Sequence, residues 1–561
     1  MPEHKKEDIV KFVTNRQTAL EKDKQLWEGL LQDVADYVNP VREDIKGIIQ
    51  SGSKQGIKIY DGTAVSAAVL ATDGIHGYHV SPAFPWFKYV MNRLNLNNLP
   101  AVKEWLEEVE HNMYMALNRS NFYSEMWPYI FDGETMGTAA IIAEEDIGDG
   151  RIIFEAVHFG EIYISENKYG EADVLHRKRK ITARQMAQMF GKDNVPEPVK
   201  QAFETQPFQQ FEILHAVYPR DDYDDRKKDA KNKKYASVWV AKDGSHLLKE
   251  SGYNQFPYKV WRYMKSGKEV YGRSPALLAM ADIKGLNLMS KTLLGAAQLA
   301  VDPPMNVPAD MMGKVQLKPR GLNYYDDPQK RIYPVSTGIN FPVGIDREEA
   351  KQKAIRDFFH VDTFLMLSRL AGQGQKTAYE VSELMGEKAA VLGAELGPLN
   401  TQLDQILDAV YEIEVNAGRM PQPPDILLEI AQQGDRFDPV YMGPLAQAQR
   451  ERFGSEGIKK FFAMIGPLVQ IKPDVLDNFD LDAAAIHIHD ISGAPAKIIR
   501  HADERDVIRQ GRAAMQQAEA QKQDAERLVQ GIKTVTEADK NTEGQLSKNM
   551  AAMIGMGGNA A

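Results

Sequence analysis

The stretch "SPALLAMADIKGLNLMSKTLLGAAQLA", residues 274–300, carries a strong helix-start signal. Ser274 suits the N-cap position, and Pro275 suits the first helical position because its missing N–H is not needed there. The pattern ends at "VDPP", residues 301–304, because proline cannot continue a helix. We therefore predict one long helix over residues 274–300.

The chain after this helix alternates between helical and irregular segments. A Pro/Gly-rich stretch covers 302–344 and holds the short strand candidates "LNYYDD" and "RIYPV". A second helix is predicted over 346–368, with a length of about 35 Å at 1.5 Å per residue. The loop "RLAGQGQKT", residues 369–377, comes next, and a very long helical pattern then runs from Ala378 to about Ala417. We expect the Gly397-Pro398 pair to kink this last helix.

The chain before residue 274 divides into a helical part and a β-rich part. Up to about residue 145 the pattern is helical, with two helices that break near Ser120-Asn121 and the second extending through "TAAIIAEED" (138–146). From 150 to 265 the runs are short, β-branched and bounded by turn residues, with a helical insert at 182–191. The mixed charge run at 220–234 is predicted to be a solvated hairpin loop, although contact with DNA is an alternative.

The C-terminal part is predicted to hold strands at "ILLEIA" (426–431) and "AIHIHDI" (485–491), with helices around them. The last helical segment, from Ala502, is rich in Gln, Ala and charge, so we expect it to pack in an oligomer or to be partly ordered. The final residues have the composition of a disordered tail. The expected fold class is α+β, predominantly helical.

Composition narrows the functions that are open to this chain. Its 561 residues contain no cysteine, which excludes a disulfide scaffold, cysteine-based catalysis and thiolate metal sites. No apolar run approaches the roughly 20 residues of a membrane span, and "MPEHKKEDIVKF" lacks the apolar region of a signal peptide. The net charge of −10 is unlike that of a protein built to grip nucleic acid.

The glycine-rich loop 369–377 has the outline of a phosphate-binding loop, but its details differ. A P-loop follows a buried strand and has a glycine directly before its lysine, whereas Gln375 precedes Lys376 here. Gly372 and Gly374 are at the wrong spacing, and the preceding segment has helical periodicity. We interpret the segment as a flexible loop between two helices, with Thr377 as the N-cap of the second.

Two other groups of residues have the chemistry of a possible site. His487, His489 and Asp490 would begin a metal site, but no further ligands follow at a recognisable spacing. The acids at 144–146 would suit a two-metal nuclease, but a solvated turn explains them equally. Without a convincing catalytic cluster, the chain favours a structural or assembly role, with no cofactor and no metal.

Several stretches together resemble the portal proteins, or head-to-tail connectors, of short-tailed bacteriophages. They extend over most of residues 25–530 and comprise "WEGLLQDVADYVNPVRED" (27–44), "IYDGTAVSAAVLATDGIHGYHVSPAFPWF" (59–87), "VYGRSPALLAMADIKGLNLMSKTLLGAAQLAVDPP" (270–304), "GQKTAYEVSELMGEKAAVLGAELGPLNTQLDQILDAVYEI" (374–413) and "YMGPLAQAQR" (441–450). No one of these motifs is specific by itself, but their order is typical of the family.

The resemblance implies a non-enzymatic ring of about twelve subunits at one capsid vertex, through which double-stranded DNA passes during packaging and ejection. The resemblance also implies that the protein binds terminase, a tail adaptor, and capsid and scaffolding proteins. It implies no association with a membrane. The protein would belong to the virion and assemble in the host cytoplasm. The implied regions are a wing (1–273), a stem helix (274–300), a clip (301–345), a second stem helix (346–368), a tunnel loop (369–377), a further wing part (378–440), crown-side helices (441–530) and a disordered tail (531–561).

Two sets of residues would then carry the function. In the tunnel loop, Gly372, Gln373, Gly374, Gln375 and Lys376 would touch passing DNA without reading its sequence. In the clip, Lys314, Lys318, Arg320 and Arg331 would dock partner proteins. The alternatives are a DNA-processing NTPase or nuclease that uses the Lys376 loop or an acidic cluster, and an oligomeric scaffold with no DNA path.

Overall fold

We describe the protein from a computed structural model. The structure describes residues 3–42, 45, 52, 54–93, 96–146, 148–224, 227, 229–242, 246–311, 313, 315–316, 323–324, 327–328, 332–334, 341–370, 378–431, 436–442, 463–467, 472, 478–482, 484–485, 500 and 502–541. The chain forms two compact units, Met1–Pro473 and Asp474–Ala561, which are described separately.

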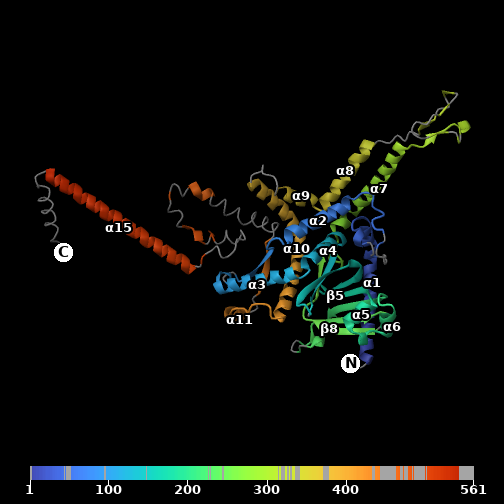
Figure 1. Ribbon diagram of the computed structural model, residues 1–561, viewed down its shortest axis with the longest axis horizontal. Helices are drawn as coiled ribbons and strands as arrows, with labels where there is room; N and C mark the ends of the chain where they lie inside the picture. Colours follow the sequence, from blue (N-terminus) through green and yellow to red (C-terminus); the bar gives the residue numbers. More distant parts are fainter. Residues whose placement is uncertain are drawn as a thin grey trace. The chain divides into compact units, whose positions relative to one another are not determined.

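Four helices form the first part of the larger unit (Figure 1): α1 (Glu3–Tyr37), α2 (Thr63–His79), α3 (Pro100–Arg119) and α4 (Phe122–Met136). The break between α3 and α4 lies at the predicted Ser120-Asn121 pair. Their apolar faces enclose a large core in which Trp86 stacks on Phe122, with ring centroids 6.0 Å apart. This core continues onto the sheet that follows α4.

A three-stranded antiparallel sheet has the order β3-β2-β9, formed by β2 (Thr138–Asp146), β3 (Arg151–Val157) and β9 (Tyr258–Arg262). The prediction that residues 138–146 continue the preceding helix is therefore wrong. Gly137 ends α4 with a φ of +75°, and the chain then enters β2. Because β2 is the central strand, its residues 138–142 are buried on both faces and show no alternation.

A five-stranded antiparallel sheet follows in the order β4-β5-β6-β7-β8. Its strands are β4 (Ile162–Glu166), β5 (Ala172–Thr182), β6 (Gln210–Pro219), β7 (Tyr235–Ala241) and β8 (His246–Tyr253). The predicted helical insert is α5 (Ala183–Phe190), and α6 (Glu197–Thr205) accompanies it. The charge run 220–234 joins the paired strands β6 and β7, which confirms the hairpin prediction.

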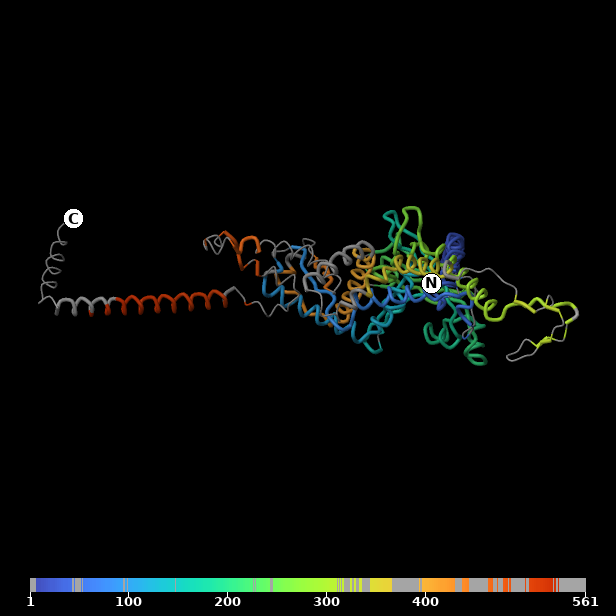
Figure 2. Tube along the Cα trace, turned by 90° about the horizontal axis from the view of Figure 1, so that it is seen from above, coloured from blue at the N-terminus to red at the C-terminus, as the bar shows by residue number. Residues whose placement is uncertain are grey.

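A helical hairpin projects from the body of this unit (Figures 1 and 2). It is formed by α7 (Pro275–Val301) and α8 (Phe341–Phe358), and the short strands β10 (Met305–Asn306) and β11 (Tyr333–Pro334) pair between them. The predicted start of α7 is confirmed, because the Ser274 hydroxyl accepts a hydrogen bond from the Leu277 N–H at 3.1 Å.

The second predicted helix of this region, 346–368, is two helices. It begins earlier, as α8, and ends at Phe358, and α9 (Val361–Leu370) follows after a bend. His360 lies at the bend with a φ of +51°, a conformation that no helix interior adopts. The prediction of one continuous helix is therefore wrong.

The larger unit closes with α10 (Ala378–Asn416), α11 (Asp425–Ala431) and β12 (Phe437–Tyr441). The long helix from Ala378 is confirmed, but "ILLEIA" is helical rather than a strand. The strand β12 pairs with β1 (Phe87–Met91), far earlier in the chain.

The smaller unit contains α15 (Ala502–Asn541), whose described side chains are almost all exposed. This helix continues past the predicted boundary at residue 530. Among all the described residues, no helix combines the length and the apolar character that a membrane span requires.

Candidate functional site

The α7–α8 hairpin is antiparallel and tightly packed. Lys351 of α8 forms an ion pair with Asp282 of α7 at 2.7 Å, and Glu348 accepts a hydrogen bond from the Ser290 hydroxyl further out along the arm. Gly344 lets the two backbones approach, because a Cβ there would lie 2.8 Å from Leu293 Cδ2. These contacts make the hairpin a paired arm rather than two separate helices.

The root of this arm is anchored to the body at several points. The buried Ser274 hydroxyl donates to the Thr135 carbonyl at 2.6 Å. Asn287 accepts from the Tyr60 N–H at 2.6 Å and donates to the Lys58 carbonyl at 2.8 Å. Lys284 pairs with Asp33 of α1 at 2.6 Å. The direction in which the arm leaves the body is therefore fixed by hydrogen bonds on more than one side.

The arm also exposes apolar side chains along α7. Large residues with between 43% and 87% of their surface exposed are Leu278, Leu288, Leu294, Leu299 and Val301. Isolated exposed leucines are ordinary, but a series of them along one projecting helix is typical of a surface that another protein covers. Within the described part of the chain, these five side chains stay largely exposed to solvent.

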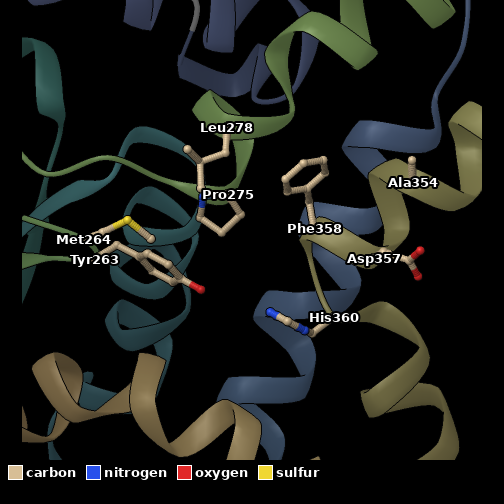
Figure 3. A pocket seen from close by; sticks show the side chains of 8 residues that line it. All are labelled: Tyr263, Met264, Pro275, Leu278, Ala354, Asp357, Phe358 and His360. Atoms are coloured by element: carbon tan, nitrogen blue, oxygen red, sulfur yellow. The ribbon is translucent and has the colours of Figure 1, made fainter.

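A pocket lies at the root of the arm, between the start of α7 and the end of α8 (Figure 3). Its volume is about 410 Å³. Its lining residues are Tyr263, Met264, Pro275, Leu278, Ala354, Asp357, Phe358 and His360. The lining is mainly apolar and contains no arrangement of nucleophile and base, so the pocket gives no indication of catalysis.

The predicted clip residues Lys314, Lys318, Arg320 and Arg331 lie outside the described residues. In the sequence they lie between β10 and β11, the strands that pair between α7 and α8. In the same segment, the Asn323 side chain accepts a hydrogen bond from the Gln316 N–H at 2.7 Å and donates one to the Gln316 carbonyl at 3.1 Å.

The predicted tunnel-loop residues Gly372, Gln373, Gly374, Gln375 and Lys376 also lie outside the described residues. The elements on either side are described: α9 ends at Leu370 and α10 begins at Ala378. Because a helix precedes the loop, the buried strand that a P-loop requires is absent at this position.

The acids at the end of β2 have ordinary structural partners. Glu144 accepts from the Tyr253 hydroxyl at 2.9 Å, Glu145 pairs with Arg419 at 3.4 Å, and Asp146 pairs with Arg151 at 3.8 Å. Within the described part of the chain, no group of three or more metal-ligating side chains comes together. His487, His489 and Asp490 lie outside that part.

The family described as "Bacteriophage head to tail connecting protein" matches residues 11–499.

The chain belongs to this family of bacteriophage head-to-tail connecting proteins.

Two relatives support the assignment to the connecting-protein family over nearly the whole chain. The "Portal protein" of Salmonella phage epsilon15 is 30% identical over 561 residues, covering 98% of each chain. The "Probable portal protein" of Bordetella phage BPP-1 is 29% identical, covering 93% of this chain and 94% of the relative. The chain is therefore a phage portal, or head-to-tail connecting, protein, as the resemblance implied.

A solved structure titled "Virion of native gene transfer agent (GTA) particle" covers 72% of this chain and 86% of its own. Its sequence identity is 11% and its TM-score is 0.34, a likeness too weak to carry an argument about this connecting protein.

Sequence reasoning missed the pocket at the root of the arm and the bend at His360. The pocket brings residues 263–278 together with residues 354–360, and periodicity within one segment cannot reveal such a contact. The bend had no glycine or proline to mark it.

Proposed function

We propose that this connecting protein forms a ring of about twelve subunits at one capsid vertex, in which the α7–α8 arm is the stem. Double-stranded DNA would pass through the ring during packaging and ejection. The observation that carries the proposal is the exposed apolar series on α7, defined by Leu278, Leu288, Leu294, Leu299 and Val301. In a closed ring each subunit has a neighbour on both sides, so such a helix would be covered.

The proposed stem also accounts for the position of the other regions. The segment between β10 and β11 would be the clip, with Lys314, Lys318, Arg320 and Arg331 as docking residues for terminase and a tail adaptor. The positive charge of these four residues suits acidic partner surfaces. The loop between α9 and α10 would be the tunnel loop, and its two glycines would allow it to adapt to moving DNA.

The negative net charge of the chain suits a channel that conducts DNA. Affinity for DNA rises with the number of phosphate contacts, so a wall that conducts DNA should make few of them. The net charge of −10 supports a mostly non-adhesive channel, with Lys376 as one phosphate contact per subunit. We propose no enzymatic activity, so any ATP hydrolysis would come from a partner.

The helix α15 would contribute on the capsid side. Its exposed apolar residues include Val507, Met515 and Val529, which would find partners in neighbouring copies. A long helix with few apolar residues gains most of its stability from such packing.

Negative-stain electron microscopy of the purified chain tests the ring. The expected result is end views with about twelve subunits and a channel wide enough for duplex DNA. The double variant Leu288→Glu/Leu294→Glu should give single subunits whose thermal unfolding is unchanged. As a matched control, Phe208→Glu changes a side chain that is 73% exposed outside the arm and should leave rings intact.

Two results would overturn parts of the proposal. Rings with a closed centre would indicate a scaffold without a DNA path. ATP turnover that is abolished by Lys376→Ala would indicate an enzyme. The tunnel-loop role has its own test, because replacing Lys376, Gly372 and Gly374 together should impair packaging or genome retention in infected cells. Normal packaging and retention by that variant would refute the role.

A further inference from the structure

The helix α1 holds together two parts of the fold that have separate apolar cores. In its first 24 residues the buried side chains recur at alternating spacings of three and four, the pattern of a narrow helical seam; they are Val10, Val13, Gln17, Leu20 and Lys24. The buried residues of the second half are Leu31, Val34, Ala35 and Asp36. The second half belongs to the main core of the larger unit.

The first half of α1 lies instead along one face of the five-stranded sheet. Val10 and Val13 pack with residues of β6 and β7, including Ala216 and Val238. Leu20 packs separately, with Tyr163 of β4 and Val174 of β5. Three buried apolar side chains, the half-buried Ile9, the Phe12–Tyr218 ring contact and the Glu21–Lys178 ion pair at 2.9 Å hold this half to the sheet. Most of its other side chains are exposed.

Two polar residues occupy the same seam, and both have specific partners. The side-chain oxygen of Gln17 lies 3.0 Å from Nδ1 of the buried His176 on β5. Lys24, with 1% of its surface exposed, donates hydrogen bonds to three backbone carbonyls, those of Phe159 (2.7 Å), Gly160 (3.0 Å) and Ile162 (2.8 Å). Three is the full number of hydrogens that an ammonium group can donate.

Two aromatic rings complete the surroundings of the Lys24 ammonium. Its Nζ lies 4.6 Å from the ring centroid of Phe159 and 4.3 Å from that of Tyr163. Both distances are within the range of a cation–π interaction. Burial lowers the pKa of Lys24 to about 7, so a buried charge here is costly, and the three carbonyls and two ring faces offset that cost.

We propose that residues 3–24 form a detachable strap over the five-stranded sheet, and that Lys24, seated among the carbonyls of residues 159–162, is the latch that holds it. The latch sits between the two cores, at the point where α1 passes from the sheet to the helical body. A slip of the helix along the sheet would leave the ammonium group without its acceptors and would remove one donor from each of the three carbonyls, of which that of Phe159 also accepts from the Ile162 N–H. Polar residues with specific partners in an apolar seam fix one register of α1 along the sheet. The strap does not depend on the ring proposed above, because all of its contacts lie within one chain.

Hydrogen exchange measured by mass spectrometry tests the strap on the unmodified full-length chain. Amides of residues 3–24 should exchange faster than amides of 28–37, because the strap opens while the second half stays in the main core. Equal protection of the two halves would mean that α1 opens as one unit, which would overturn the proposal.

The variant Lys24→Met tests the latch, because it keeps an apolar chain of similar length and removes the donors. Exchange in residues 3–20 should rise about tenfold or more, since the carbonyls of Phe159, Gly160 and Ile162 lose the Lys24 donor, and residues 28–37 should be unchanged. Lys22→Met is the matched control, because Lys22 is exposed on the same helix. A Lys24→Met chain that exchanges like the control would refute the latch.

Chemical rescue separates the ammonium group from the volume it fills. In Lys24→Ala, added propylammonium chloride should restore the protection of residues 3–20, whereas 1-propanol, which has the same carbon chain, should not. Equal rescue by both compounds would show that packing alone holds the strap, and the proposal would be wrong.

Discussion

Gly133 of α4 lies flat against the indole ring of Trp261 on β9. A Cβ at Gly133 would lie 2.0 Å from Trp261 Cζ3, and the tryptophan is fully buried. The variant Gly133→Ala should therefore lower the free energy of unfolding by about 1–3 kcal/mol, the usual cost of overpacking a core.

Thermal and chemical unfolding of the unassembled chain measures this effect. Gly77→Ala is the matched control, because Gly77 is an exposed helical glycine of α2 with open space around it. That variant should raise stability by about 0.5–1 kcal/mol through helix propensity. Similar effects of the two substitutions would contradict the close contact at Trp261.

Arg42 and Asp132 form a two-point ion pair, with N–O distances of 3.0 and 2.9 Å, and only 2% of the aspartate side chain is exposed. Arg42→Ala should lower the free energy of unfolding by about 3–5 kcal/mol, because it leaves an unpaired buried charge. Adding Asp132→Asn should recover part of that loss. The exposed pair of Lys200 and Glu197, tested with Lys200→Ala, should change stability by less than about 1 kcal/mol. Equal losses in the two single variants would count against a buried charge at Asp132.

Buried histidines make stability depend on pH. Burial, with a smaller contribution from Arg16, lowers the pKa of His176 to about 3, and burial also lowers the pKa of His79 and His215. Below pH 6.5 the unfolded chain binds protons that the folded chain does not. The free energy of unfolding should therefore fall as pH drops below 6.5, by up to about 1.4 kcal/mol per pH unit for each histidine.

The variant His176→Gln isolates one of these contributions. Its stability should fall less steeply than that of the wild type between pH 6.5 and pH 5, whatever its stability at pH 7. Urea unfolding at several pH values gives both slopes. The exposed His246 provides the control, and His246→Gln should keep the wild-type slope. An unchanged slope in His176→Gln would contradict the assignment.

The bend between α8 and α9 depends on the backbone of His360, whose φ is +51°. Glycine adopts this conformation freely, whereas a β-branched residue is strained in it. His360→Val should therefore be less stable than His360→Gly by about 1–2 kcal/mol, measured by thermal unfolding. Arg356→Val, at an exposed helical position of α8, should have only the small effect of helix propensity. The reverse order of the two His360 variants would contradict a left-handed bend.

The sequence predicts those elements whose ends carry their own chemical signals. Ser274 and Pro275 mark the start of α7, and Ser120-Asn121 marks the break between α3 and α4. The strand β2 was misread because it is covered on both faces, so its apolar run has no period. The segment "ILLEIA" was misread for the related reason that a short apolar run suits either a strand or a helix.

The α7–α8 arm could be predicted only from the order of helices and loops along the chain, which resembles that of the portal family. Nothing local in 274–300 or 346–368 reveals that Asp282 meets Lys351, because that pairing depends on how the intervening chain returns. The pocket at the root of the arm likewise depends on tertiary contacts between the residues that follow β9, the start of α7 and the end of α8. The family resemblance supplied the function because it uses the order of segments along the whole chain, which no single motif contains.

The pairing of β1 with β12 means that folding of this protein cannot finish until β12 has been synthesised. Phe87–Met91 has no partner strand until Phe437–Tyr441 exists, and roughly 350 residues of chain separate them. At about 5–20 residues per second, the ribosome needs roughly 17–70 seconds to make that stretch. During this interval the edge of β1 is open to other chains on the same messenger RNA. A cell that makes many copies at once therefore has to protect this edge until translation of each chain is nearly complete.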